Sequence, residues 1–511
     1  MVSGASVTSG QQKSLWLRTQ QQPVFSPLSG NISTNVCVIG GGLAGLTTAY
    51  MLARDGVSVI VLEDGFIGSG ETGRTTAHLS NVMDDRYTEI ERLHGGRGAH
   101  LAAESHSAAI RCIEQTVYEE SIQCDFQRLN GYLILSPEHE ERLLTEEMTA
   151  AHRAGLSSVE LLRQPPLPDV HRPCLRFPQQ AQFHPLRYLA ALAAAIVKRG
   201  GQIYTQTHAT AIEDGSPARV KTASGFTVES RAIIVATNTP INDLVAIHTK
   251  QAAYRSYVVG FLIPKEAVPL GLYWDTSDPY HYVRLQSYSE KEDVLIVGGE
   301  DHKTGQGDEG DRTARLIEWA REWFPLAKTA AFRWSGQIME PIDGLAFIGR
   351  NPGDDNVYIV TGDSGMGMTH GTIAGMLLSD LVAGRPNAWA ELYDPARIPL
   401  RAATEFAREN VNVAGQYMKW VKPGEVKSVE EITPGQGAIM SQGMTKLAVY
   451  RQPNGEAHIR SAVCPHLQCI VAWNAEENTW DCPCHGSRFD CYGKVLNGPA
   501  NTDLSQAAKA A

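Results

Sequence analysis

The 511-residue sequence lacks the segments that would place it in or across a membrane. A membrane-spanning helix needs about 20 consecutive apolar residues. The longest candidate run, YLAALAAAIV, is shorter and is followed at once by Lys198 and Arg199. The opening residues, MVSGASVTSGQQKSLW, lack the charged and apolar regions of a secretory signal. We therefore expect no membrane span and a cytoplasmic location.

An excess of positive charge is also missing. The formal net charge is -11, whereas nucleic acids and anionic membranes reward clustered Lys and Arg. Nucleic acid is therefore not an expected partner. Four of the nine cysteines are scattered as free buried thiols usually are, and only the group near the C-terminus is spaced like a site.

The first motif along the chain lies at residues 36–63 and has the pattern of a nucleotide-binding segment, VCVIGGGLAGLTTAYMLARDGVSVIVLE. It predicts a strand, a tight glycine turn, a helix and a second strand. In a G-x-G-x-x-G turn the glycines permit the bend, admit a pyrophosphate and allow close helix packing. The turn residues are Gly40, Gly42, Leu43, Ala44 and Gly45. Glu63, at the end of the second strand, is placed to accept hydrogen bonds from ribose hydroxyls.

A second complete G-x-G-x-x-G motif is missing. An enzyme that takes hydride from NAD(P)H in a two-dinucleotide fold usually has one. We therefore expect the electrons to come from an organic substrate.

Further motifs follow the first turn: the segment from Gly70 to Thr76, WSGQIMEPIDGLAFIG at 334–349, and TGDSGMGMTHG at 361–371. With the N-terminal turn, this order over about residues 34–390 resembles the FAD-dependent D-amino acid oxidase superfamily, which includes glycine oxidase-like enzymes. The resemblance implies bound FAD and a small amine or amino acid substrate that gives hydride to the flavin. It implies FAD contacts from Arg74, Thr75, Thr76, Gly362, Gly365, Met366, Gly367, Met368 and Thr369.

The resemblance also implies an α/β fold in which a Rossmann-like FAD-binding domain is interleaved with a mixed-sheet substrate domain. We expect an N-terminal extension at 1–34 and the oxidoreductase at 35–390. Its nucleotide-binding pieces are expected at about 35–80, 155–250 and 334–390, and its substrate domain at about 81–150 and 250–333. A connector at 391–424 then leads to an all-β domain at 425–505.

The substrate residues are harder to assign. Glycine oxidase-like relatives carry an Arg after the W/A-x-G element to bind the substrate carboxylate, but here Trp334-Ser335-Gly336 is followed by Gln337. Either the substrate lacks that carboxylate, or Arg255 or Arg284 replaces the missing Arg. Tyr257 is a further candidate for the pocket, as are Tyr254 and Tyr282, although aromatic residues at strand spacing are often core.

Two more positions bear on the chemistry. Ile296 occupies the place of a Lys that promotes reaction with oxygen in sarcosine oxidase-like relatives, which favours a dehydrogenase. His78 lies near the position where dimethylglycine-type enzymes attach flavin covalently, but a non-covalent contact or plain packing is the preferred interpretation.

The C-terminal cysteines and histidines form the second motif. Cys464-Pro-His466 and Cys482-Pro-Cys484-His485 give the C-x-H and C-x-x-H pattern of a Rieske [2Fe-2S] centre. A structural zinc site is the alternative. The match to the Rieske fold covers about 425–505 and implies the ligands Cys464, His466, Cys482 and His485, a disulfide between Cys469 and Cys484, and a covering loop at Gly498-Pro499-Ala500.

One position departs from the quinol-oxidising Rieske class. Ser487 is kept, but Phe489 stands where that class has a Tyr whose hydroxyl bonds to a ligand sulfur. Because such hydrogen bonds tune the cluster, we expect a lower reduction potential.

The sequence therefore predicts a dehydrogenase of a small amine or amino acid that passes electrons singly to its own Rieske cluster. An external acceptor (a ferredoxin, a cytochrome or a quinone-linked carrier) would then take them. The alternative is a flavin/Rieske relay for a partner redox system. A weaker alternative makes the Rieske domain structural and the flavin domain an oxygen-reducing oxidase.

Overall fold

The computed structural model describes residues 12–242, 247–306, 311–398 and 400–507. The expected N-terminal extension lies partly outside these ranges. Its described part contains a short helix whose Leu15 and Trp16 are buried. Trp16 donates its indole N–H to the Thr75 carbonyl at 2.6 Å, so the segment packs beneath the loop that precedes β3.

The first sheet has a parallel centre. Among the described residues it contains eight strands, with the order β16-β17-β10-β1-β2-β7 and the hairpin β8–β9 attached to β10. The central strands end in fully buried runs, as expected for parallel strands covered on both faces. The bounds are β1 (Ile32–Ile39), β2 (Val59–Leu62), β7 (Gln202–Tyr204), β8 (Ala209–Glu213), β9 (Ala218–Thr222), β10 (Thr227–Val235), β16 (Phe347–Arg350) and β17 (Val357–Thr361).

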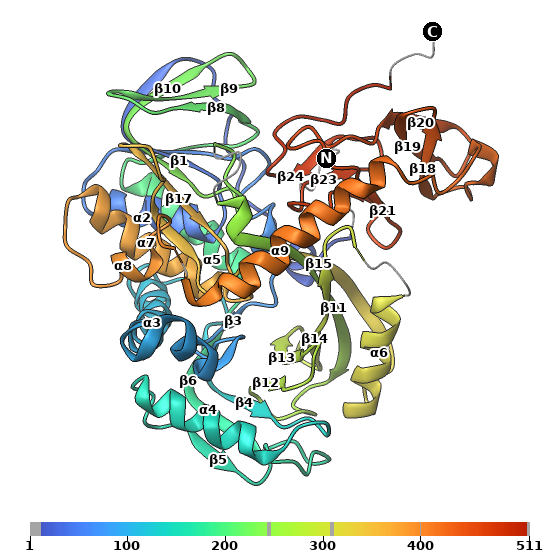
Figure 1. Cartoon of the computed structure of the whole chain (residues 1–511). Helices are drawn as coiled ribbons and strands as arrows, with labels where there is room; N and C mark the ends of the chain where they lie inside the picture. Colours follow the sequence, from blue (N-terminus) through green and yellow to red (C-terminus); the bar gives the residue numbers. More distant parts are fainter. Residues whose placement is uncertain (1–11, 243–246, 307–310, 399, 508–511) are drawn as a thin grey trace.

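Helices cover one face of this sheet and the β8–β9 hairpin covers the other (Figure 1). Helices α2, α5 and α7 contribute to the helical side of the core. The helix bounds are α1 (Leu15–Thr19), α2 (Leu43–Arg54), α3 (Arg86–Glu119), α4 (Glu141–Arg153), α5 (Pro185–Lys198), α6 (Arg312–Trp323), α7 (Gly367–Val382), α8 (Ala390–Tyr393) and α9 (Ala403–Gln416).

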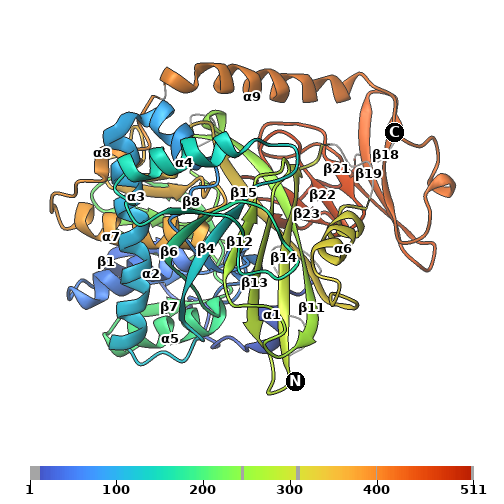
Figure 2. The same cartoon turned by 90° about the horizontal axis from the view of Figure 1, so that it is seen from below.

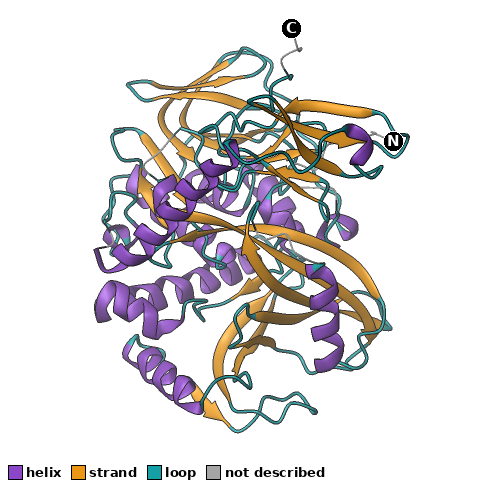
Figure 3. Cartoon of the chain, turned by 45° about the vertical axis from the view of Figure 1, so that its right-hand side comes forward, coloured by secondary structure: helices purple, strands orange, loops and turns teal. Residues whose placement is uncertain are grey.

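The second sheet is mixed and contains nine strands within the described ranges, in the order β15-β11-β14-β13-β12-β4-β6-β3, with β5 paired to β6. Helix α6 packs on one face, and Figure 3 shows the curvature of the long strands. The bounds are β3 (His78–Leu79), β4 (Gln127–Ile134), β5 (Glu160–Leu162), β6 (Cys174–Gln182), β11 (Gln251–Pro264), β12 (Leu272–Asp275), β13 (His281–Ser287), β14 (Glu292–Lys303) and β15 (Ala330–Pro341).

The division of the chain differs from the expected pieces in three places. Strand β3, inside the piece expected at 35–80, pairs with β6 in the second sheet. Strands β5 and β6 pair in the second sheet, although 155–250 was expected to be nucleotide-binding, and β15 pairs with β11 instead of continuing the first sheet. Long-range strand pairing decides these assignments, and a local apolar run cannot reveal its partner.

The C-terminal domain is built from two small antiparallel sheets, so the predicted class of mixed α/β followed by all-β is confirmed. Connector helix α9 runs along one edge of the molecule from the α3–α8 side to these sheets (Figure 2). The strands are β18 (Gly437–Gln442), β19 (Thr445–Arg451), β20 (Ala457–Ser461), β21 (Ala472–Asn474), β22 (Thr479–Asp481), β23 (Arg488–Asp490) and β24 (Val495–Asn497).

Candidate functional site

The first glycine turn joins β1 to α2 at the edge of a cavity of ≈ 330 Å³. Gly40 has φ 112°, and a Cβ there would lie 2.4 Å from the Ala236 carbonyl oxygen. A Cβ at Gly45 would lie 2.0 Å from the Gly40 oxygen, so both positions need glycine. Gly42 precedes α2 and offers no capping side chain. The Leu43 N–H donates to the Thr72 hydroxyl at 3.1 Å, and the other N–H groups of the first turn suit an anion.

Glu63 lies at the end of β2 and lines the same cavity. Its carboxylate accepts hydrogen bonds from the N–H groups of Gly41 (2.6 Å) and Gly65 (2.7 Å) and from the Ser69 hydroxyl (3.1 Å). Burial raises the pKa of Glu63, and these hydrogen bonds oppose the rise. A carboxylate has about four acceptor positions, so capacity remains for the ribose contact, which stays a prediction.

The second glycine turn brings the start of α7 to the same cavity. Gly362 and Gly365 have φ of 76° and 68°, and a Cβ at Gly365 would lie 1.7 Å from Asp84 Oδ2. Gly371 of α7 is in contact with Ala44 of α2, where a Cβ would lie 3.3 Å from the Ala44 nitrogen. Two helix N-termini therefore meet at one cavity, which suits an anionic, extended ligand.

Most of the residues expected to contact FAD line this cavity. Gly45 is not among the described lining residues, because it packs against Gly40 beneath the turn. The expected contacts that line it are Gly40, Gly42, Leu43, Ala44, Glu63, Arg74, Thr75, Thr76, Gly362, Gly365, Met366, Gly367, Met368 and Thr369. The close approach at both glycine turns and the two helix starts at the cavity fit a bound dinucleotide.

Arg74 reaches the cavity wall, but its guanidinium points into the protein. Its Nη atoms donate to the carbonyls of Ser335 (2.9 Å) and Gln12 (3.0 Å), and Glu477 of the C-terminal domain lies 3.7 Å away. Burial lowers the pKa of Arg74 to about 10, which leaves it charged at neutral pH. Arg74 therefore ties three segments together at the cavity wall.

The expected substrate residues separate into two groups. Gln337 is buried and lines the cavity. Trp334 is buried in the core, where its indole N–H donates to the Arg74 carbonyl at 2.7 Å. It supports the wall from behind and is not among the described lining residues.

Arg255 and Tyr257 are carried away from the cavity by strand alternation. Ser256 and Val258 of β11 line the cavity, so the neighbouring residues face the other side of the sheet. Tyr257 joins the core beneath α6 and stacks on His302. We expected Arg255 and Tyr257 to touch the substrate, but both lie on the face of the sheet that points away from the cavity.

Arg255 is fully buried, and among the described residues none of its three guanidinium nitrogens has a hydrogen-bond partner. Burial lowers its pKa; the charge of Arg488 lowers it further, and Glu477 and Asp481 of the C-terminal domain oppose the shift. Arg255 therefore belongs to the contact between the two domains.

Arg284 is also committed to a structural role. Its Nη1 donates to the carbonyls of Thr76 (3.2 Å), Ala77 (2.9 Å) and Phe183 (3.1 Å), and its guanidinium lies 5.4 Å from the Trp16 ring. It fixes the backbone beside the cavity and is not among the described lining residues. The expectation that Arg284 binds a substrate carboxylate is therefore also corrected.

The cavity wall formed by the second sheet is aromatic. Trp274, Tyr280 and Tyr282 line it together with His78, whereas Tyr254 and Ile296 are not among the described lining residues. Burial lowers the pKa of His78 to about 3, so its ring is neutral. The Tyr280 hydroxyl donates to Asp84 Oδ2 at 2.9 Å.

The expected cluster ligands come from two adjacent loops of the C-terminal domain. The rings of His466 and His485 lie 4.9 Å apart between centroids, and Cys464 and Cys482 are buried in the same core. The pKa of Cys464 is lowered by hydrogen bonds from the Cys482 thiol, from backbone N–H groups and from the Ser487 hydroxyl. His485 Nδ1 is buried without a hydrogen-bond partner among the described residues, which fits a metal ligand.

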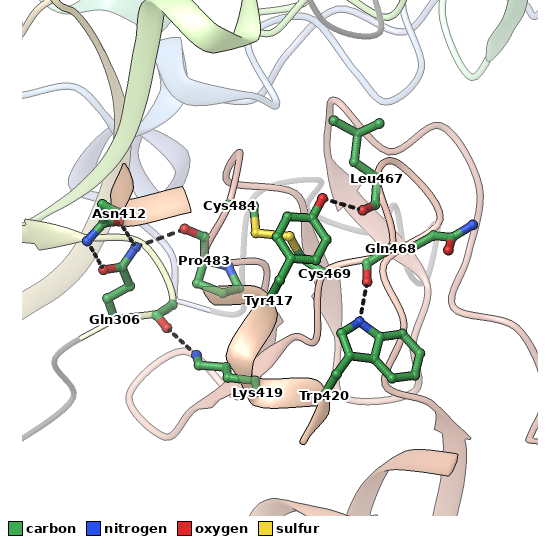
Figure 4. The surroundings of a disulfide bond; sticks show 11 residues. Gln306, Asn412, Tyr417, Lys419, Trp420, Leu467, Gln468, Cys469, Pro483 and Cys484 are labelled. Atoms are coloured by element: carbon green, nitrogen blue, oxygen red, sulfur yellow. Dashed lines mark hydrogen bonds between the residues drawn. A yellow bond between two sulfur atoms is a disulfide. The ribbon is translucent and has the colours of Figure 1, made fainter. Parts of the chain in front are cut away.

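The predicted disulfide between Cys469 and Cys484 is present and joins the two loops. The sulfur atoms of Cys469, Cys482 and Cys484 lie within 4.8 Å of one another. Figure 4 shows Tyr417 and Trp420 beside this bond, donating to the carbonyls of Leu467 (2.7 Å) and Gln468 (3.0 Å). The end of the connector thus holds the first ligand loop.

The cluster loops are docked against the flavin-binding part. The ring of His248 lies 5.0 Å from that of His466 and 6.0 Å from that of His485. Gln337 donates its side-chain N–H to the Gly486 carbonyl at 2.9 Å. One residue of the cavity wall therefore touches the loop that carries a cluster ligand.

The covering loop of the C-terminal domain completes the cavity. Asn497 donates to Glu71 Oε1 at 2.9 Å, and Asn501 donates to the Ala209 carbonyl at 3.1 Å. The lining residues from this region are Val495, Leu496, Asn497, Gly498, Ala500 and Asn501. The cavity is therefore shared by the two domains.

Sequence reasoning missed His248, Asp84, Tyr280 and Glu477. No local motif marks them, because each acts through a partner far along the chain. The only sequence signal for a different substrate wall was that Gln337, and not an Arg, follows Gly336.

Comparison with known proteins identifies both parts. The pattern of the family described as FAD dependent oxidoreductase matches residues 35–381. The chain belongs to this family. The Rieske [2Fe-2S] domain pattern matches residues 419–508. FAD and a [2Fe-2S] cluster are therefore its cofactors, and the zinc alternative falls away.

Relatives share one or both parts. A protein of Bacillus subtilis named putative Rieske 2Fe-2S iron-sulfur protein YhfW is 33% identical over 96% of each chain. The gamma-glutamylputrescine oxidoreductase of Escherichia coli is 29% identical over 72% of this chain and 88% of its own. Glycine oxidase from Geobacillus kaustophilus has the same fold, with a TM-score of 0.59 and 18% identity over 72% of this chain and 99% of its own.

Within the described ranges, no helix combines the length and the apolar character that crossing a bilayer requires.

Proposed function

We propose that this FAD-dependent oxidoreductase dehydrogenates a small amine or amino acid and passes the electrons singly through its Rieske cluster to an external acceptor. A ferredoxin, a cytochrome or a quinone-linked carrier fits that last role. When bound, FAD supplies two-electron chemistry and the cluster one-electron chemistry.

The observation that supports this proposal is that both domains line the flavin cavity. Gln337 lines the flavin cavity and donates to Gly486, the residue after the expected ligand His485. The covering loop at 498–500 lies against the same cavity. This arrangement supports transfer within the docked molecule, without movement of one domain across the other.

The chain's own residues supply positioning. The N-termini of α2 and α7 both place partial positive charge at the cavity, where an anionic pyrophosphate and a developing negative charge would be stabilised. The docked covering loop lines the cavity from the side of the C-terminal domain. Aromatic side chains on β12 and β13 form an apolar wall for the substrate.

Anaerobic rapid mixing with amines and amino acids tests the proposal. We expect bleaching of the flavin absorption, followed by the absorption change of a reduced Rieske cluster, with little peroxide formed in air. Reduction only by NAD(P)H or by a reduced protein donor would instead favour the relay. Rapid peroxide formation with an oxidised cluster would favour the oxidase.

A further inference from the structure

The flavin cavity offers no free positive side chain for a substrate carboxylate. Arg74 is the only Lys or Arg among the described residues that line it. The Nη atoms of Arg74 are bonded to backbone carbonyls, and its charge faces the buried Glu477. Arg255 and Arg284 are buried outside the lining. Burial lowers the pKa of the lining His78 to about 3 and that of His370 to about 4. The hydrogen bond to Asp64 raises the pKa of the lining His208, but this ring is already paired with the Asp64 carboxylate at 3.3 Å.

Acidic side chains are common in the same wall. Glu63, Asp64, Glu71, Asp84 and Asp363 line the cavity. Glu63 is satisfied by two backbone N–H groups and a hydroxyl, and Glu71 accepts from the Gln337 N–H (2.7 Å) and from Asn497. Asp64 pairs with His208 at 3.3 Å, and Asp363 accepts from the Met339 backbone N–H at 2.8 Å. Each of these four carboxylates is therefore bonded to a backbone N–H or to a histidine of the protein.

Asp84 differs from them. Within the described ranges it accepts one hydrogen bond, from the Tyr280 hydroxyl, and forms no ion pair within 4 Å. Burial raises the pKa of Asp84 to about 8, and the nearby carboxylates of Asp85, Asp301 and Asp363 add to the rise. A cation placed beside Asp84 would relieve this repulsion.

The surroundings of Asp84 also suit a cation. Tyr280 and Tyr282 line the cavity with ring centroids 5.5 Å apart, and aromatic faces attract ammonium groups. Gln337, which is 2% exposed, lines the same cavity, and its Oε1 has no hydrogen-bond partner among the described residues. The cavity therefore presents unused acceptors, which call for a ligand rich in N–H donors.

We propose that Asp84 pairs with an ammonium group of the substrate, so that the substrate is an amine without a free carboxylate. The inference rests on the proposed function and narrows its substrate class from amines and amino acids to amines. The Asp84 carboxylate, the rings of Tyr280 and Tyr282, and the lack of a free Lys or Arg among the described lining residues all favour a cationic ligand.

Three ligands of one length make a direct test: pentylamine, 1,5-diaminopentane and 5-aminopentanoate, with glycine as a short α-amino acid. Each is titrated anaerobically into the holoenzyme, and both the perturbation or bleaching of the flavin spectrum and the heat of binding are measured. We expect both amines to bind at least about tenfold more tightly than either amino acid, because all four ligands carry an ammonium group but the carboxylate of the amino acids would lie in the cavity without a cationic partner.

The variant Asp84→Asn keeps the shape of the side chain and removes its charge. We expect it to lose about tenfold or more in affinity for both amines while it keeps FAD and the cluster, as judged by their absorption. Asp169→Asn is the matched control, because it removes the same charge from an exposed side chain that is not among the described lining residues.

The outcomes separate the two proposals. A preference for amines, together with an amine affinity that falls in Asp84→Asn and is kept in Asp169→Asn, supports the inference. Tighter binding of the amino acids, or equal amine affinity in Asp84→Asn, overturns it and leaves the dehydrogenase function standing. If no amine and no amino acid binds or reduces the flavin, both are overturned.

Discussion

The two cofactor regions of this protein are built by opposite means. The four expected cluster ligands lie between Cys464 and His485, and side chains from two loops supply them. The flavin cavity is lined by residues from Ile39 to Asn501, and its glycine turns offer backbone instead of side chains. A site made of local side-chain ligands is recorded in one motif, whereas a site made of backbone and distant walls depends on the whole fold.

The strongest test of this contrast removes one cluster ligand. We expect Cys464→Ser to abolish the Rieske absorption and its electron paramagnetic resonance signal, because a hydroxyl is a poor replacement for an iron-bound thiolate. Bound FAD should remain near one per chain. Cys491→Ser, in the same buried core, should keep the cluster. Loss of FAD in Cys464→Ser would show that the two sites are not independent.

The second test changes a glycine turn of the flavin cavity instead of a cluster ligand. We expect Gly45→Ala to lose most bound FAD and to lower the free energy of unfolding by about 3 kcal/mol, because its Cβ would lie 2.0 Å from the Gly40 oxygen. Flavin content and thermal unfolding measure both effects. Gly30→Ala, with nothing within 4 Å of its Cβ, is the control. Normal FAD content in Gly45→Ala would contradict the proposed packing role of this glycine.

The contact between the regions can be weakened separately. Glu477→Gln leaves the buried Arg74 without its ion-pair partner. Because Arg74 keeps two carbonyl hydrogen bonds, we expect a loss of about 2 kcal/mol in the free energy of unfolding and slower reduction of the cluster after flavin bleaching. Glu456→Gln, at an exposed site of the same domain, should change neither. An unchanged reduction rate in Glu477→Gln would argue against transfer through the docked contact.

The raised pKa of Asp84 predicts that amine binding depends on pH. The pKa of Asp84 is raised to about 8 by burial and by Asp85, Asp301 and Asp363, while the Tyr280 hydroxyl opposes the shift. Below pH 8 the free protein therefore binds a proton that a cation must displace. We expect affinity for a permanently charged quaternary amine to rise with pH, by up to about tenfold per unit, and to level off above 8. Calorimetric titration between pH 6 and about 9 measures it, and a flat profile would exclude Asp84 as the binding group.

The smallest expected effect concerns the cluster potential. Phe489 is fully buried in the Rieske core, at the place where the quinol-oxidising class has Tyr. We expect Phe489→Tyr to raise the reduction potential by about 40 mV, equivalent to roughly 1 kcal/mol for one electron. Ser487→Ala should lower it, because the Ser487 hydroxyl bonds to Cys464. If a redox titration shows the same potential in Phe489→Tyr, the missing hydroxyl at position 489 does not lower the cluster potential.

The sequence alone was sufficient for the two motifs and for the fold class. The glycine turn is where its motif predicted it, and the disulfide between Cys469 and Cys484 that the Rieske resemblance implied is present; the ribose contact of Glu63 stays a prediction. In both cases the interacting groups lie within a short stretch of chain, so their spacing reports their geometry.

Only the tertiary structure decided what the cavity can hold. Strand alternation in β11 turns Ser256 toward the cavity and Arg255 toward the Rieske domain, and a shift of one residue in an apolar strand would reverse the two. The long-range packing of α3, β13 and α7 places Asp84, Tyr280 and Gly365 together. Local sequence determined the cofactors because their ligands are near one another along the chain, whereas the substrate wall depends on contacts between distant segments.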